Sequence, residues 1–293
     1  MKWNFKAHAV CAGALSVSCL APVLSGCIEL PLPEVTDVVI EEEATLPRHG
    51  IYRPADLESL GARLPLVVWA EGACLLPSTF FGEFLAEIAA HNYLVIANNG
   101  LDEWGLTSSD MLIDAIDWAV AENSRTESKY FDRIDTSKIA MMGQSCGGLE
   151  ALHAGDDSRV TTVVSWNSGI FDVGNLGGAT KADLQELTAP TLWITGGPLD
   201  VAYPQSVSDY ALVPDHVPAV LAHYDLSDRG AALTGAHLGT YLESRGGVYG
   251  EAAVLWLDFM LKDVEANRSY FIGEPCGLCE QDSRWSIEHK NWD

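Results

Sequence analysis

Basic residues are scarce in this sequence. Its 293 residues include 17 Lys and Arg against 41 Asp and Glu, which gives a formal net charge of −24 at pH 7. A surface this acidic repels the phosphate backbone, so the composition excludes a nucleic-acid-binding protein. It also provides no electrostatic attraction to anionic lipid. We interpret the excess acid as a contribution to solubility.

The sequence also lacks internal repeats and low-complexity segments, and nothing in it marks a second domain. Hydrophobic residues make up 48% of the chain and charged residues 20%. This is an ordinary globular composition, and the chain is long enough for one large core.

The apolar run at the N-terminus, Ala7–Leu24, lacks the continuity of a transmembrane helix because Gly13 and Pro22 interrupt it. A positively charged start, Met1–Lys6, precedes it, and small residues follow it. This is the layout of a secretory signal peptide over residues 1–26, so we expect an exported protein.

The sequence Leu24-Ser-Gly-Cys27 at the end of this run resembles the bacterial lipobox. The resemblance implies that Cys27 is lipidated and becomes the mature N-terminus, which would anchor the protein on the periplasmic or cell-surface face of a membrane. Ordinary secretion with soluble release is the alternative. Residues 27–36 contain Pro31 and Pro33 and are predicted to form a short stiff tether.

Strand-like and helix-like segments alternate along the rest of the chain. The run Leu64–Ala70 is continuously apolar, as expected for a strand buried on both faces. The alternation predicts an α/β protein with a doubly wound, mostly parallel sheet and helices on both faces, in a single domain over residues 37–293. The other predicted strands are Val38–Ile40, Gly50–Arg53, Tyr93–Ala97, Ile139–Met142, Thr162–Trp166, Thr191–Thr195 and Ala219–Tyr224; the predicted helices are Ser78–Ala90, Met111–Val120 and Val248–Leu261; and an irregular, cysteine-containing tail follows Asp263.

The motif Gly143-Gln-Ser145-Cys-Gly147 lies between an apolar strand and a helical stretch. In that context Gly-x-Ser-x-Gly indicates a nucleophilic serine on a tight, strained strand-to-helix turn. Side chains at the two glycine positions would clash there. Cys146 is a rival nucleophile, but residue 144, two positions before it, is Gln rather than Gly, so we predict Ser145.

A serine nucleophile needs a base and an orienting acid, which follow it in the order acid, then histidine. Asp200 follows the strand Thr191–Thr195 and is the predicted acid, with Asp225 as the reserve. His237 lies in a glycine-flanked loop after the last predicted parallel strand and is the predicted base. The other histidines considered lie on or next to predicted helices and strands.

An oxyanion hole in this arrangement uses two backbone N–H groups. The predicted donors are Cys146 and, in the loop after the Leu64–Ala70 strand, Ala73. Cys74 and Cys146 each adjoin a donor, so a Cys74–Cys146 disulfide that braces the hole is one hypothesis, and two buried thiols are the alternative. Cys276 and Cys279 have no second cysteine pair to complete a metal site, so we predict a local disulfide.

These features together resemble the bacterial cutinase and polyester-hydrolase neighbourhood of the α/β-hydrolase superfamily, which borders dienelactone-hydrolase-like and platelet-activating-factor-acetylhydrolase-like enzymes. The matching segments are Val67–Gly72, Glu87–Ile96, Ile139–Gly148, Pro190–Asp200, His237 and Trp256–Tyr270. The resemblance implies a serine ester hydrolase that uses an acyl-enzyme, no cofactor and no metal, with a small-molecule or polymer ester as substrate. It also implies that Trp166 and Phe171 line the acyl groove, although Trp166 is equally well interpreted as a core residue.

The same triad would serve an acyltransferase or a lactone or peptide hydrolase. A non-catalytic surface lipoprotein that keeps the fold as a binding module is the alternative from another functional class. The sequence carries no indication of an oligomeric state.

Overall fold

The computed structural model describes residues 35–173 and 177–292. The predicted signal peptide, Cys27 and all but the last two residues of the predicted tether lie outside the described residues. Within the described ranges, none of the helices has both the length and the apolar character needed to cross a membrane.

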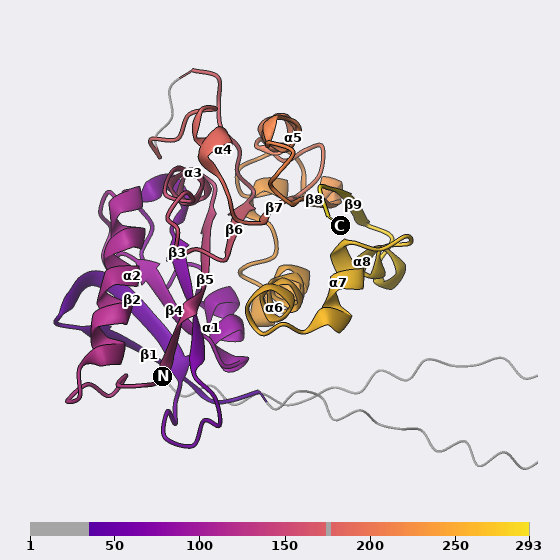
Figure 1. Ribbon diagram of the computed structural model, residues 1–293. Helices are drawn as coiled ribbons and strands as arrows, with labels where there is room; N and C mark the ends of the chain where they lie inside the picture. The colour runs from indigo at the N-terminus through magenta and orange to yellow at the C-terminus, as the bar shows by residue number, and fades with distance from the viewer. Residues whose placement is uncertain (1–34, 174–176, 293) are drawn as a thin grey trace, which may run out of the picture.

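The described residues form one open, nine-stranded sheet in the order β1-β2-β4-β3-β5-β6-β7-β8-β9 (Figure 1). The strands from β4 through β8 in this order run parallel, whereas β1, β2 and β9 pair antiparallel at the two sides. The doubly wound, mostly parallel sheet predicted from the sequence is therefore confirmed. The strands are β1 (Val38–Glu43), β2 (Leu46–Pro54), β3 (Leu64–Ala70), β4 (Leu94–Asn98), β5 (Ile134–Gln144), β6 (Thr162–Trp166), β7 (Thr191–Thr195), β8 (Ala219–Tyr224) and β9 (Trp285–Lys290).

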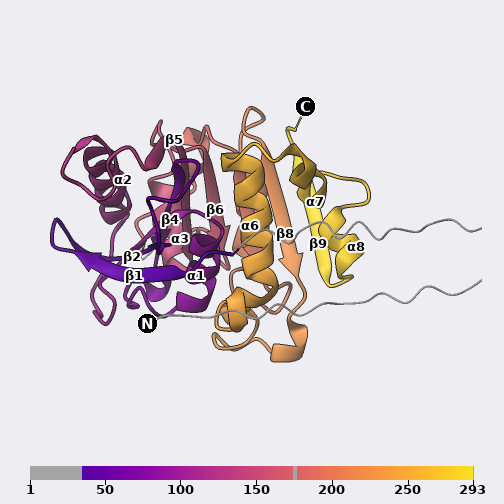
Figure 2. The ribbon, with the colours of Figure 1, turned by 90° about the horizontal axis from the view of Figure 1, so that it is seen from below.

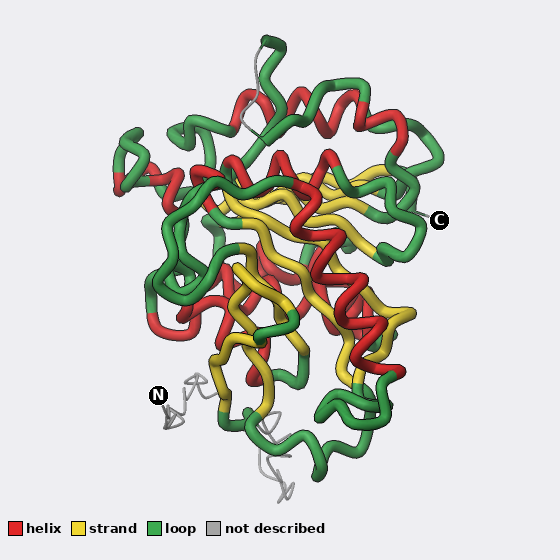
Figure 3. The backbone as a smooth tube through the Cα atoms, turned by 90° about the vertical axis from the view of Figure 1, so that its left-hand side faces the viewer, coloured by secondary structure: helices red, strands yellow, loops and turns green. Residues whose placement is uncertain are grey.

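Helices cover both faces of the sheet. One layer contains α2 (Ser109–Ser124), α3 (Cys146–His153), α4 (Asp183–Glu186) and α5 (Tyr203–Leu212), and the other contains α1 (Gly82–Ala90), α6 (Gly247–Leu261), α7 (Arg268–Phe271) and α8 (Gly277–Gln281). Figure 2 shows the second layer lying across the sheet, and Figure 3 shows the strands enclosed between helices. Each layer packs on its own hydrophobic core.

The alternation of side chains along β3 explains why both faces need a cover. Val67 and Trp69 point into the core beneath α1 and α6, while Leu66 and Val68 point into the core beneath α2 and α3. All seven residues of β3 are buried. A strand whose residues are apolar at every position is typical of a parallel sheet that helices cover on both faces.

Two regions differ from the sequence prediction. The acidic residues Glu41–Glu43 continue strand β1 rather than ending it, because the Glu41 carboxylate accepts hydrogen bonds from Arg53 and Lys129. The tail after Asp263 is not irregular: it contains α7, α8 and β9, and β9 pairs with β8 along its whole length.

Parallel strands bring their carboxyl ends to one edge of the sheet. The loops that follow β3, β5, β6, β7 and β8 are therefore neighbours, although they are far apart in the sequence. Functional residues in doubly wound proteins gather at this edge.

Candidate active site

Ser145 occupies the sharp turn between β5 and α3. Its backbone has φ 55° and ψ −118°, a strained conformation for a residue with a side chain. The Ser145 N–H donates to the carbonyl oxygen of Trp166 at 2.9 Å, and its own carbonyl oxygen accepts from the Ser168 hydroxyl at 2.5 Å. Of residues 141–150, Ser145 alone is not buried. Ser145 is therefore the one partly exposed residue in an otherwise buried segment.

The two glycines of the motif are required by the close packing of this turn. A Cβ atom on Gly143 would lie 2.2 Å from the carbonyl oxygen of Gly147. A Cβ atom on Gly147 would lie 2.1 Å from the carbonyl oxygen of Ala70. Because both neighbours are backbone atoms, a side chain at either position would displace the turn or strand β3. The clash predicted from the motif is confirmed.

The side chains of Ser145, His237 and Asp200 form one hydrogen-bonded chain. His237 Nε2 lies 2.9 Å from Ser145 Oγ, and His237 Nδ1 lies 2.7 Å from Asp200 Oδ1. A carboxylate only accepts hydrogen bonds, so Nδ1 carries the proton and Nε2 accepts from the serine hydroxyl. The three residues that the sequence places in loops after β5, β7 and β8 are thus brought together.

His237 is held within a short 3₁₀-helix, η3 (Ala236–Leu238), and is buried. Its carbonyl oxygen accepts a hydrogen bond from the Gln144 side-chain amide at 3.2 Å. Gln144 directly precedes Ser145, so this bond connects the turn that carries Ser145 to the loop that carries His237, independently of the side chains of Ser145, His237 and Asp200.

Asp200 is buried, and its carboxylate is saturated with donors. Oδ1 accepts from His237 and from the Ala202 N–H at 3.0 Å, and Oδ2 accepts from the Gly196 N–H at 3.0 Å and from Asn167 Nδ2 at 2.7 Å. Burial alone raises the pKa of this carboxyl, but the hydrogen bonds and charge interaction outweigh burial and hold the pKa of Asp200 below its ordinary value. Asp200 therefore stays ionised next to the imidazole.

The two predicted oxyanion donors lie in loops that pack together. Ala73 is in the 3₁₀ turn η1 (Gly72–Cys74), which directly follows β3 and contacts the start of α3, where Cys146 is the first helical residue. Neither backbone N–H donates a hydrogen bond to another group in the described ranges. Both are thus available as donors beside Ser145.

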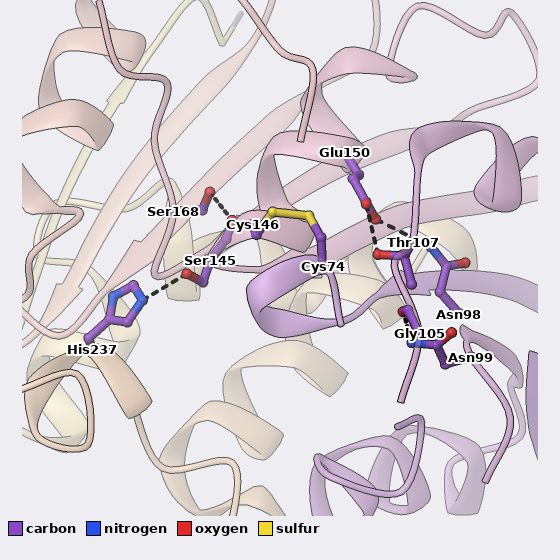
Figure 4. Close-up of a disulfide and its surroundings, with 10 residues drawn as sticks. All are labelled: Cys74, Asn98, Asn99, Gly105, Thr107, Ser145, Cys146, Glu150, Ser168 and His237. Carbon is purple, nitrogen blue, oxygen red and sulfur yellow. Dashed lines mark hydrogen bonds between the residues drawn. A yellow bond between two sulfur atoms is a disulfide. The ribbon is translucent and has the colours of Figure 1, made fainter. Parts of the chain in front are cut away.

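A disulfide joins these two loops. Cys74 and Cys146 are bonded, with their Cα atoms 5.2 Å apart, and Figure 4 shows the bond lying beside Ser145. Of the two hypotheses for these cysteines, the structure supports the disulfide. Cys146 is itself one predicted donor, and Cys74 directly follows Ala73, the other. The bond therefore limits the relative movement of the two N–H groups.

Removing this disulfide should weaken both folding and any reaction at Ser145. For Cys74→Ser combined with Cys146→Ser we expect kcat to fall by up to about 10²-fold, because a shift of about 1 Å in a catalytic group has effects of that size. The cysteines are 72 residues apart in the sequence, and cross-linking a loop of this length stabilises a fold by about 4 kcal/mol in the chain-entropy description. Steady-state kinetics below the melting temperature and thermal unfolding measure the two effects.

The second disulfide supplies the matched control. Cys276 and Cys279 are also bonded, as predicted, at the start of α8 and away from the loops that carry Ser145 and Ala73. The double serine variant of this pair is expected to keep the kcat of the wild type. Equal kcat values in the two double variants would contradict the bracing role.

No family model and no curated protein matches this chain. The interpretation of the site therefore depends on the geometry of its own residues.

The structure treats the two predicted groove residues differently. Trp166 is fully buried, and its ring packs against Phe84, Tyr241 and Tyr249. This is the core position that the sequence allowed as the alternative, because Trp166 points to the face covered by α1 and α6. Phe171 is exposed on the loop after β6, at the same edge of the sheet as Ser145.

Two buried carboxyl groups lie near η1, the turn that contains Ala73. Glu71 directly precedes η1, and Glu150 is on α3, where its side chain accepts from Thr107 at 2.8 Å (Figure 4). Burial raises the pKa of Glu71 well above its usual value, and it raises the pKa of Glu150 to about 7. Burial thus favours the neutral form of Glu71, directly before the turn that contains Ala73.

Sequence reasoning missed Asn167 as a residue of the site. It follows β6 directly, is fully buried, and donates a hydrogen bond to the Asp200 carboxylate. The rule that identified Asp200, a polar side chain just beyond the carboxyl end of a parallel strand, applies equally to Asn167.

Among the described residues, no group of three or more His, Cys, Asp or Glu is arranged to hold a metal ion.

Proposed function

We propose that this protein is a serine carboxylic-ester hydrolase of the α/β-hydrolase superfamily, similar to the bacterial cutinases and polyester hydrolases. The observation that carries the proposal is the continuous chain from Ser145 Oγ through His237 to Asp200, with distances of 2.9 and 2.7 Å. Its position at the carboxyl edge of a parallel sheet, on a strained serine turn, adds independent support.

In the first half of the reaction His237 Nε2 takes the hydroxyl proton while Ser145 Oγ attacks the ester carbonyl carbon. The carbonyl oxygen becomes an oxyanion that accepts hydrogen bonds from the backbone N–H groups of Ala73 and Cys146. Each such donor typically stabilises the transition state by about 3–4 kcal/mol. As the tetrahedral intermediate collapses, His237 gives its proton to the leaving alkoxide, and an acyl group remains on Ser145.

In the second half water replaces the alcohol. His237 removes a proton from the water, whose oxygen attacks the acyl carbon, and the proton then passes to Ser145 Oγ as the carboxylic acid leaves. Asp200 remains ionised throughout. It holds the imidazole in the reactive tautomer and stabilises the imidazolium that forms in both halves.

Hydrolysis of p-nitrophenyl acetate, butyrate, octanoate and palmitate tests the proposal, with wild type compared with Ser145→Ala. We expect turnover of at least one ester by the wild type and loss of that turnover in the variant. The chain-length profile measures the size of the acyl pocket. A wild type that hydrolyses none of the esters and does not react with a fluorophosphonate would favour the binding lipoprotein instead.

A further inference from the structure

Asn167 contacts both of the loops that complete the triad. One hydrogen of its side-chain amide is directed to Asp200 Oδ2 at 2.7 Å, and the same nitrogen lies 3.3 Å from the carbonyl oxygen of Ala236, the residue before His237. Its backbone N–H donates to Ile194 of β7 at 2.6 Å. Asn167 has φ 41°, in the left-handed region that asparagine tolerates better than most residues. The residue is thus fixed by its backbone and its side chain together.

The orientation of this amide is set by Tyr241. The Tyr241 hydroxyl donates to Asn167 Oδ1 at 2.5 Å, which directs the opposite end of the amide, the NH₂ group, toward Asp200. Burial raises the pKa of Tyr241 well above its ordinary value, so the hydroxyl keeps its proton. The tyrosine ring is fully buried, and it packs against Phe81 and Phe84. Its donor is therefore held in one place.

This arrangement fixes the rotation of the triad carboxylate. A carboxylate has about four acceptor positions, and in Asp200 two donors contact each oxygen. Asn167 is, within the described residues, the one side chain besides His237 that donates to it. Without that donor, Oδ2 would keep the Gly196 N–H alone and the carboxylate could turn away from the imidazole.

We propose that Asn167, oriented by Tyr241, is a positioning residue that locks the Asp200 carboxylate and through it the ring of His237. The inference depends on the proposed function, because it concerns the efficiency of the same triad. It extends the hydrogen-bonded chain to five side chains, from Tyr241 at one end to Ser145 at the other.

The variant Asn167→Asp tests the proposal because it replaces the amide with a group of the same shape whose donor depends on pH. Two carboxyl groups this close share one proton at low pH, so Asp200 still receives a hydrogen bond. At higher pH both ionise and repel each other, and Asp200 moves away from His237. Besides Asp200 and His237, the titratable groups that face Asn167 in the described residues are the hydroxyls of Tyr241 and Tyr249, whose pKa values burial raises. The charge of Arg229 acts on Tyr249 and partly opposes the rise in its pKa.

We therefore expect kcat/KM of Asn167→Asp to fall by about 10-fold or more on the alkaline side, at pH values where the wild type is constant. The loss should appear in kcat, with KM within about two-fold of the wild type. A profile parallel to that of the wild type at all pH values would overturn the proposal. A role in folding alone would lower the melting temperature without adding a new limb to the pH profile.

Tyr241→Phe provides a second test if Asn167→Asp does not fold or is inactive at every pH. Removing the hydroxyl lets the amide turn, and we expect kcat to fall by about 10-fold. Tyr93→Phe is the matched control, since it also removes a buried hydroxyl, one bonded to Asp258 at 2.7 Å at the opposite edge of the sheet. Equal kcat values for the two phenylalanine variants would overturn the proposal.

Failure of this inference is distinguishable from failure of the proposed function. A wild type that hydrolyses esters and reacts with a fluorophosphonate, combined with a parallel pH profile in Asn167→Asp, removes the positioning role and leaves the esterase. A wild type inactive in both assays removes both.

Discussion

Alanine at Ser145 or at His237 is expected to lower kcat for ester hydrolysis by about 10⁴- to 10⁶-fold, and the double variant is expected to be no worse than either single variant. The reason is that the two side chains act as one unit: Ser145 Oγ loses its proton to His237 Nε2 across 2.9 Å. Once either partner is missing, the other contributes nothing further. Single-turnover and steady-state kinetics with p-nitrophenyl butyrate measure the effect.

Histidine 153 serves as the control for this experiment. It lies at the end of α3, is exposed, and contacts Asp183 at 3.2 Å, away from the carboxyl edge of the sheet. His153→Ala should keep the kcat of the wild type. If the loss in the double variant equalled the product of the losses in the two single variants, or if His153→Ala lost a comparable amount of activity, Ser145 and His237 would not form a catalytic unit.

Asparagine at position 200 is expected to reduce kcat by about 10⁴-fold while leaving the fold intact. The Asp200 carboxylate accepts a hydrogen bond from the protonated Nδ1 of His237, with Oδ1 and Nδ1 2.7 Å apart. An amide in its place can donate to Nδ1, which would move the imidazole proton to Nε2 and leave Ser145 without an acceptor. The activity loss should appear with KM little changed, as measured over a range of ester concentrations.

Asp225 is the matched control for Asp200, because the sequence offered both residues as the triad acid. In the structure Asp225 is exposed, and its Oδ1 accepts from the Ser227 N–H at 2.9 Å rather than contacting His237. Asp225→Asn is therefore expected to retain activity. If the Asp225 variant lost more activity than the Asp200 variant, our choice of acid would be wrong.

Much of the fold follows from local sequence patterns. The continuous apolar run of β3 and the Gly-x-Ser-x-Gly turn after β5 are local features, so their residues alone predict a buried parallel strand and a strained serine. Asp200 and His237 could be predicted because chain order and the ends of strands restrict the choice to a few residues. The disulfide between Cys74 and Cys146 followed as a hypothesis from placing two loops at one edge.

Other features depend on contacts between distant segments. Strand β9 contains Glu288, His289 and Lys290, a polar sequence that forms a strand because β8 supplies the hydrogen-bonding partner. The hydroxyl of Tyr241 contacts Asn167, 74 positions earlier, and no pattern around either residue indicates the bond. Such pairs become visible only when the complete topology is known.

Covalent labelling with a fluorophosphonate, followed by peptide mass spectrometry, tests most directly whether Ser145 is an activated nucleophile. The probe reacts with a serine whose hydroxyl is activated by a base, so the experiment does not require the natural ester to be known. We expect a single adduct on the peptide that contains Ser145 and none in Ser145→Ala. An unlabelled wild type, or an adduct on a different serine that persists in Ser145→Ala, would contradict the account.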